Sequence, residues 1–137
     1  MDWKLSREQE AAVKTVLDKW NSAASTWDAD ALSEVYAEEG LLMAGQPGHY
    51  RGKAEIRKYF LSYAVKTTRL DLVEQSAIQL SDDAFLVQGI GNFAGSLPDG
   101  RIVKNSLRTT WVLGKRQGGW KILDHHFSPI PPVHRFE

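Results

Sequence analysis

The chain has 137 residues, of which 42% are apolar and 25% are charged, and it contains no cysteine. Seventeen basic residues balance seventeen acidic ones, so no surplus of positive charge would attract nucleic acid. Without cysteine the chain has no disulfides, no thiolate chemistry and no cysteine-built zinc site. This composition predicts one globular domain over residues 1–137, large enough for a hydrophobic core.

The first predicted element is an amphipathic helix. Ser6 and Gln9 are spaced as a capping box, in which the side chain of each residue accepts a hydrogen bond from the backbone amide of the other. Apolar residues then recur at helical spacing and predict a single buried stripe. The stripe consists of Val13, Val16, Leu17, Trp20, Ala24 and Trp27.

A second, shorter helix is expected to begin at Asp28 or Asp30, which are good capping residues, and to end at Gly40. Its inward residues are Leu32, Val35 and Tyr36. A short buried strand follows over residues 41–44. A third helix is predicted from about Lys53 to Tyr63, burying Ile56, Tyr59, Phe60 and Tyr63.

The remainder of the chain predicts four long strands, over residues 67–80, 84–95, 101–113 and 119–127. Turn residues separate them, so sequential hairpins should form an antiparallel meander. Gly89 and Gly91 interrupt the second of these strands and predict a bulge or a sharp bend that curls the sheet. Helices followed by such a meander indicate an α+β domain.

The charged N-terminal residues do not form a secretory leader pattern. No apolar run reaches the length of a membrane span. We therefore expect a cytoplasmic protein with no membrane or nucleic-acid partner.

The last strand carries the triplet Asp124-His125-His126. Side chains alternate between the two faces of a strand, so the two histidines must point in opposite directions and cannot chelate one metal together. Buried polar groups need partners, which makes this strand a candidate wall of a site. We predict no bound metal and no cofactor, because zinc requires three or four converging ligands.

The order of elements, together with several short motifs, resembles the nuclear transport factor 2-like superfamily. The motifs are Trp20 followed by residues 28–32, Val35 to Gly40, Tyr50 to Ile56 with Tyr59-Phe60, and Trp120 before the histidine pair. The resemblance implies a cystatin-like, cone-shaped, curled antiparallel sheet whose concave face is covered by three N-terminal helices. This fold hosts isomerases, dehydratases, hydrolases and non-enzymatic adaptors, so it does not by itself define an activity.

Within that superfamily the N-terminal pattern is similar to ketosteroid isomerase. That family requires a tyrosine on the first helix as oxyanion donor and an aspartate base at the end of the first strand. Trp20 and Ala44 occupy those positions here. Enolisation needs both a base and a donor, so steroid-isomerase chemistry is not expected.

A second similarity is to SnoaL-like proteins and to the association domain of calcium/calmodulin-dependent protein kinase II. Arg108-Thr109-Thr110 and His125-His126-Phe127-Ser128-Pro129 carry it, although Phe127 replaces a serine. By this resemblance Arg108 and His126 would face the conical cavity, and His125 would lie on the opposite face, where this fold makes dimers. Arg108 could instead be a surface or dimer residue, and His126 a hydrogen-bonded core histidine.

Two functions remain open. In the first, the protein binds a small organic molecule in a hydrophobic pocket and could turn it over as an isomerase, lyase or hydrolase acting on a polyketide-like or steroid-like compound. His126 and Asp124 would then form an acid–base pair. The ligand-binding residues would be Arg108, Trp20, Tyr36, Tyr59, Tyr63 and Thr110. In the second, it is a non-catalytic association module. In both cases a homodimer is expected, because the strands are apolar on both faces.

Overall fold

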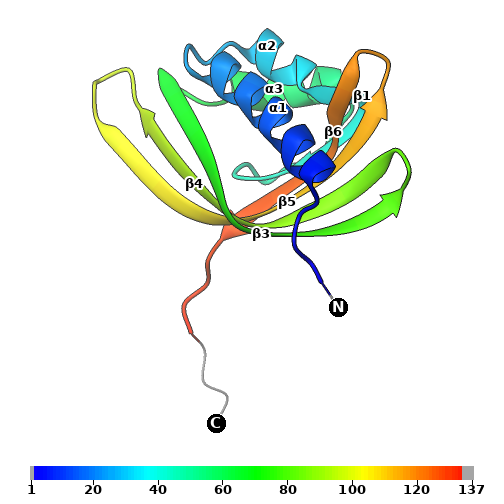
Figure 1. Cartoon of the computed structure of the whole chain (residues 1–137). Coiled ribbons are helices and arrows are strands. Elements are labelled where there is room, and N and C mark those ends of the chain that lie inside the picture. Colours follow the sequence, from blue (N-terminus) through cyan, green and yellow to red (C-terminus); the bar gives the residue numbers. More distant parts are fainter. Residues whose placement is uncertain (1, 134–137) are drawn as a thin grey trace.

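A computed structural model describes residues 2–133. It contains three helices and six strands: α1 (Arg7–Ala24), α2 (Ala29–Glu34), β1 (Tyr36–Met43), β2 (Tyr50–Arg51), α3 (Lys53–Leu61), β3 (Thr67–Ser81), β4 (Ala84–Ser96), β5 (Ile102–Arg116) and β6 (Gly119–Pro129). The strands form one curled sheet, and the helices cover its concave side (Figure 1). The predicted α+β architecture is therefore confirmed.

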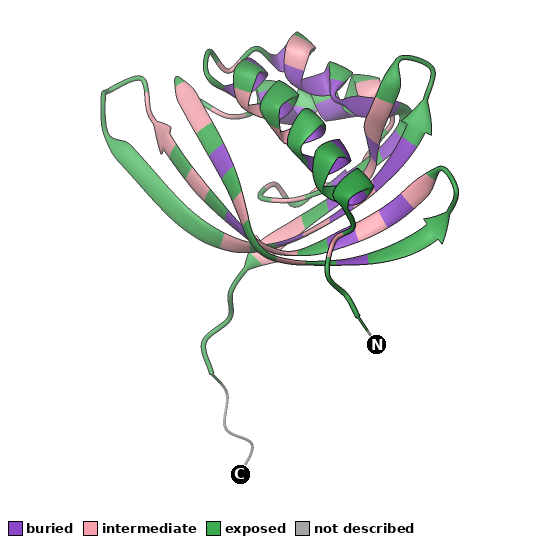
Figure 2. Ribbon diagram, viewed as in Figure 1, coloured by how far each residue is buried: buried purple, intermediate pink, exposed green. Residues whose placement is uncertain are grey.

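Both predicted helix starts are present. The Ser6 hydroxyl accepts a hydrogen bond from the Gln9 amide at 3.1 Å, and the Gln9 side chain accepts from the Ser6 amide at 2.8 Å. Asp28, rather than Asp30, caps α2 by accepting from the Ala31 amide at 3.1 Å. Each cap satisfies a backbone donor that the helix itself leaves free. The buried residues of α1 then face the sheet, as the apolar stripe predicts (Figure 2).

The order of strands in the sheet is β2-β1-β6-β5-β4-β3. Strands β3 to β6 form the predicted antiparallel meander. Strand β1, however, runs parallel to β6, so the predicted antiparallel sheet contains one parallel pair of strands. The two strands lie at opposite ends of the chain, and no tight hairpin joins them to impose an antiparallel direction.

The second helix is shorter than predicted and the first strand is longer. Helix α2 ends at Glu34, and Tyr36 already belongs to β1, where it is paired with Ile122 of β6. The Ile122 amide also donates to the Val35 carbonyl at 3.0 Å. Val35 and Tyr36 are both buried as predicted, but Val35 forms the C-cap of α2, and Tyr36 lies in a strand, which suits an aromatic side chain better than a helix end. Gly40 consequently lies inside β1 and does not end the helix.

The glycine in the middle of β4 permits a bulge in the neighbouring strand. The β3–β4 register shifts between Val73 and Ser76, and Glu74 has a positive φ of 55°. A Cβ atom at Gly89 would lie 2.4 Å from the Glu74 carbonyl oxygen, which is too close for any other residue. A bulge bends and twists its strand, so this glycine contributes to the curl that was expected near Gly89 and Gly91.

Helix α1 is tied to the backbone of the edge strand β3 by the side chain of Asn21. The Asn21 amide group donates to the Leu70 carbonyl at 2.8 Å, and its oxygen accepts from the Leu70 amide at 2.7 Å. Strand β3 is an edge strand, so Asn21 occupies the place that a neighbouring strand would take. This contact holds α1 across the concave face.

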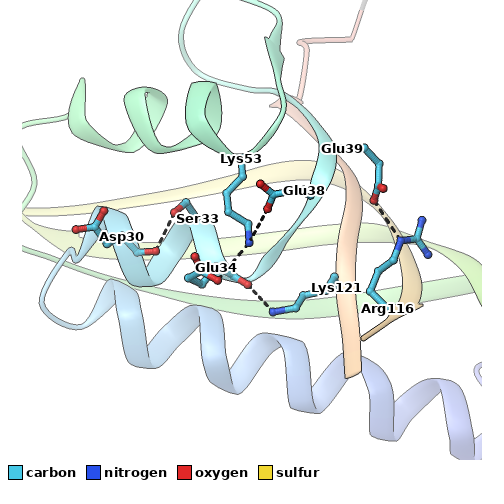
Figure 3. Close-up of polar contacts among 8 residues, drawn as sticks. All are labelled: Asp30, Ser33, Glu34, Glu38, Glu39, Lys53, Arg116 and Lys121. Atoms are coloured by element: carbon cyan, nitrogen blue, oxygen red, sulfur yellow. Dashed lines mark hydrogen bonds and ion pairs between the residues drawn. The ribbon is translucent and has the colours of Figure 1, made fainter. Parts of the chain in front are cut away.

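At the other edge of the sheet, a set of ion pairs joins α2, β1 and α3 (Figure 3). Lys53 Nζ lies 3.2 Å from carboxylate oxygens of both Glu34 and Glu38. Lys121 of β6 donates to the Glu34 carbonyl at 2.7 Å. The glutamates are largely exposed, so each ion pair alone contributes little to stability. Together the ion pairs hold the first part of β1 against α2 and α3.

Among the described residues, no helix combines the length and the apolar character needed to cross a bilayer.

Candidate functional site

A cavity of about 380 Å³ lies between the concave face of the sheet and the helices. Trp20 from α1, Tyr36 from β1, and Tyr59 and Tyr63 from α3 and its C-terminal end line it, as the sequence predicts. The other lining residues are Trp27, Ala44, Gly45, Phe60, Val65, Thr68, Phe93, Gly95, Ser96, Leu97, Val103, Asn105, Leu107, His125, Phe127, Ser128 and Pro129. None of these residues carries a carboxylate, an ammonium or a guanidinium group. The cavity is therefore apolar, with only a few polar atoms on its wall.

One hydrogen-bonded chain ends at a histidine on this wall. Trp20 Nε1 donates to the Tyr36 hydroxyl at 3.3 Å, and that hydroxyl lies 2.9 Å from His125 Nδ1. An indole nitrogen can only donate, so the Tyr36 oxygen accepts from Trp20. We assign the Tyr36 proton to Nδ1, because the opposite assignment would leave this buried hydroxyl proton without an acceptor among the described contacts. With this assignment the neutral imidazole carries its proton on Nε2. Nε2 is buried and has no hydrogen-bond partner among the described residues.

Burial keeps this histidine neutral. The pKa of His125 is lowered to about 3, mainly because the side chain is completely buried and to a smaller extent because His126 lies nearby. Burial also raises the pKa of Tyr36, although the hydrogen bond from Trp20 opposes the rise. Neither group changes its charge near neutral pH. His125 therefore stays neutral and does not act as a base in the cavity that it lines.

A second, similar chain ends elsewhere on the wall. The Gly45 amide donates to the Tyr59 hydroxyl at 3.2 Å, and that hydroxyl donates to the Tyr63 hydroxyl, also at 3.2 Å. Burial raises the pKa of Tyr59, and the hydrogen bond to Tyr63 raises it further, so Tyr59 stays protonated. The proton of Tyr63 finds no acceptor in the described part of the chain. Two residues that line the cavity, His125 and Tyr63, thus end hydrogen-bonded chains, and each has a donor without an acceptor among the described residues.

The predicted orientation of the histidine pair was wrong. His125 faces the cavity, whereas His126 is exposed on the convex face of the sheet together with Arg108 and Thr110. That orientation was inferred from the resemblance alone. In the structure the register of β6 shifts, because Leu113 pairs with Ile122 but Val112 pairs with Asp124. The extra residue interrupts the alternation of side chains, so Ile122 and His125 are both buried although they are three residues apart.

The convex face has a hollow of its own, of about 410 Å³. Arg108, Thr110, His126 and Ser128 line it, so three predicted site residues do lie together, but outside the cavity. Asp124 is opposite Val112, one step further along the same face. Burial raises the pKa of Asp124, while His126 and His49 oppose the rise. No hydrogen bond joins Asp124 to His126 among the described contacts, and neither lines the cavity, so the acid–base pair expected inside the cone is not formed there.

Among the residues that the structure describes, no three histidine, aspartate or glutamate side chains come together as a set that could hold a metal ion.

Sequence reasoning assigned His125 to the wrong face and did not select Trp27 as a lining residue. Two observations point to His125. It pairs with Trp111 of β5. The more apolar face of β5, which carries Leu107, Trp111 and Leu113, points inward. Register against an apolar neighbouring strand is a more direct signal than resemblance to other chains.

Comparison with known proteins assigns the chain to a family. The family model of the SnoaL-like domain matches residues 13–133. The chain belongs to the SnoaL-like family. No curated protein sequence matches it.

Solved structures of similar fold include a protein from Xanthomonas campestris provisionally named a calcium/calmodulin dependent protein kinase II association domain. It is 25% identical, with a TM-score of 0.81 and 97% of each chain covered. A ketosteroid isomerase-like protein from Erwinia carotovora atroseptica is 21% identical, with a TM-score of 0.71, covering 93% of this chain and 100% of that one. A protein from Novosphingobium aromaticivorans, provisionally named an aromatic ring hydroxylase, is 20% identical, with a TM-score of 0.77 and 94% of each chain covered. These structures show that the chain shares their fold but do not define an activity.

Proposed function

We propose that the protein binds a small, uncharged, largely aromatic molecule in its cavity and holds a carbonyl oxygen of that molecule with His125 Nε2–H. The observation that carries this proposal is that His125, one of the residues lining an otherwise apolar cavity, has a buried Nε2 without a hydrogen-bond partner among the described residues. A buried donor without an acceptor costs about 1–3 kcal/mol, and a ligand oxygen would remove that cost. The cavity volume lies within the usual range for small-molecule sites.

The absence of charge from the lining favours a neutral ligand over an anion. Arg108 was the residue expected to hold a negative charge, and it lies on the convex face. An anion inside the cavity would be desolvated without an opposite charge on the described lining, which is costly. The aromatic side chains, in contrast, suit a flat apolar ring system.

The same lining favours binding over proton-transfer catalysis. Ala44 lines the cavity at the place where a ketosteroid isomerase would have its aspartate base, so no carboxylate is available there to take a proton. His125 donates through Nε2, and its Nδ1 is already occupied by Tyr36. The cavity can therefore orient a carbonyl group, but the described lining has no base with which to enolise it.

The test compares two ligands of nearly equal shape. Acetylnaphthalene carries a carbonyl oxygen, whereas ethylnaphthalene of the same substitution does not. Binding is followed by quenching of tryptophan fluorescence, because Trp20 and Trp27 line the cavity. We expect the ketone to bind about fivefold to a hundredfold more tightly, since the hydrocarbon leaves the buried donor unpaired. Naphthoate should bind more weakly than either.

The variant His125→Asn keeps an acceptor for Tyr36 but no longer reaches the cavity as a donor. It should lose most of the preference for the ketone while still binding ethylnaphthalene. The matched control is His126→Asn, which removes the adjacent exposed histidine and should keep the preference. If neither naphthalene binds, or if the ketone preference survives in His125→Asn, the proposed function is wrong.

A further inference from the structure

We propose that the rim of the cavity docks on the surface of an anionic lipid membrane. The rim consists of exposed side chains from the end of α3, the start of β3 and the β4–β5 hairpin, which forms one end of the sheet (Figure 1). Three of them are apolar and three are lysines. They are Leu61, Ile102, Val103, Lys58, Lys66 and Lys104.

Strand pairing brings the rim together beside the opening of the cavity. Thr67 pairs with Ser96, and Ser96 pairs with Ile102. The Lys66 amide also donates to the Ser96 carbonyl at 2.9 Å. Val103, the next residue of β5, lines the cavity although it is 38% exposed. The cavity therefore reaches solvent at this end of the sheet.

This end of the molecule is positively charged although the whole chain is neutral. Residues 57–70 include four basic residues and no acidic one, and residues 96–105 include two basic residues and one acidic one. The three arginines among them each pair with an aspartate. The three rim lysines form no ion pair among the described residues. The rim therefore carries a local positive surplus that attracts anionic lipid headgroups.

The exposed apolar side chains favour a membrane over a purely charged partner. Ile102 is 69% exposed and Leu61 is 57% exposed. Lys58 lies one helical turn before Leu61, and Lys104 lies two residues after Ile102 on the same face of β5. A bilayer interface accepts apolar side chains while nearby lysines extend to the headgroups. Each exposed apolar residue of α3 and β5 thus has a lysine placed to act with it.

The rim lies far from the part of the convex face where we expect a dimer. Ile78, which belongs to that face, is eleven residues from Thr67 along β3. This separation corresponds to roughly 35 Å of extended strand. A dimer through the convex face can therefore leave the rim of each copy free.

The sequence-based expectation of no membrane partner considered the overall charge and the absence of a spanning segment. A surface contact requires neither a charged chain nor a span, because a local patch of apolar and basic side chains is sufficient. The proposal therefore replaces that expectation for the surface of a membrane, not for its interior.

The experiment measures cosedimentation of the full chain with lipid vesicles at low and at raised salt. Vesicles of phosphatidylcholine alone are compared with vesicles that contain equal parts of phosphatidylcholine and phosphatidylglycerol. We expect binding only to the anionic vesicles, and weaker binding at raised salt because the charges are screened.

Two variants test the two components of the rim. Each basic residue near an anionic surface strengthens binding about fivefold, so Lys66→Gln combined with Lys104→Gln should weaken it about twentyfold. Ile102→Asn should weaken it about tenfold, because an apolar side chain no longer enters the interface. All three residues are exposed, so the variants should fold as the parent does.

Lys4→Gln and Val133→Asn are the matched controls, since they change an exposed lysine and an exposed valine outside the rim. Both should bind anionic vesicles as the parent does. No binding of the parent to anionic vesicles, or equal losses in the controls and the rim variants, would overturn the proposal. If Ile102→Asn binds as the parent does and only the lysine variant is weakened, the rim recognises charge alone, as an acidic protein or a nucleic acid would present it, and the membrane proposal is wrong.

Docking does not depend on the cavity ligand, so the two proposals can fail separately. His125→Asn should bind anionic vesicles as the parent does, and the lysine variant should bind acetylnaphthalene in solution as the parent does. A parent protein that binds vesicles but no naphthalene would reject the cavity ligand and retain the docking surface. The reverse result would reject the docking surface and retain the cavity ligand.

Discussion

His125 should make the folded protein unstable in mild acid. In the unfolded chain a histidine has its ordinary pKa of 6.5, whereas burial lowers the pKa of folded His125 to about 3. Below pH 6.5 the unfolded state therefore binds a proton that the folded state cannot, and stability falls as the pH falls. The loss begins near pH 6.5 and continues down to about pH 3.

The magnitude follows from these two values. Between pH 7.5 and pH 5.0, a group with an unfolded pKa of 6.5 that stays neutral when folded costs about 2 kcal/mol of unfolding free energy. Because pH 5.0 lies well above the folded pKa, this loss is set almost entirely by the unfolded state. Protonation of carboxylates contributes mainly at lower pH, and the comparison with His125→Asn separates the effect of His125 from that of the other titrating groups.

Urea denaturation at pH 7.5 and 5.0, at matched ionic strength, measures the effect. The parent and His126→Asn, in which His125 is intact, should both lose about 2 kcal/mol more than His125→Asn does. His125→Asn is expected to be less stable than the parent at pH 7.5, because it packs less well among the aromatic rings, but its stability should depend little on pH over this window. A parent and a His125→Asn variant with the same pH dependence would refute the assignment of His125 as a buried neutral group.

Three further predictions concern the fold and its assembly. Asn21→Leu should lower the free energy of unfolding, measured by urea denaturation, by about 2–3 kcal/mol, because it leaves both backbone groups of Leu70 unpaired at the sheet edge. A decrease of less than ~0.5 kcal/mol, the size typical of a surface substitution, would contradict this. Gly89→Ala should destabilise the protein by at least ~2 kcal/mol, since its Cβ would collide with the Glu74 carbonyl; an unchanged unfolding midpoint would show that the bulge is not needed. We also expect a homodimer through the convex face, where Met43 and Ile78 are exposed, and a monomer mass in light scattering at micromolar concentration would exclude it.

Local signals in the sequence were sufficient for most of the fold. The capping box at Ser6, the spacing of the α1 stripe and the turn residues between strands act within a few residues, and the structure confirms each of them. Tyr59 and Tyr63 were also predictable as inward residues from their spacing of four, although α3 ends at Leu61 and Tyr63 lies just beyond it rather than within the helix. Such features depend on neighbours in sequence.

The features that sequence reasoning missed depend on partners far away along the chain. Tyr36 belongs to a strand because β6, more than eighty residues later, pairs with it. The side to which His125 points depends on one extra residue in β6 opposite Val112, and nothing in residues 119–129 alone marks that position. A single bulge was enough to exchange the faces of two adjacent histidines, and with them the cavity residue and the surface residue.

The exchange of faces also changes what kind of chemistry the cavity can support. Had His126 and Asp124 faced inward, the cavity would have held a group that titrates near neutral pH beside a carboxylate, and ligand affinity or turnover would vary with pH in that range. With His125 inward, the buried imidazole stays neutral and the burial of Tyr36 and Tyr59 keeps both hydroxyls protonated. Affinity of the folded protein for acetylnaphthalene should therefore be constant between pH 5.5 and 8, even though stability falls across part of that range. An affinity that changed tenfold in this interval, with the protein still folded by circular dichroism, would mean that a titrating group reaches the ligand and would restore an acid–base role for the site.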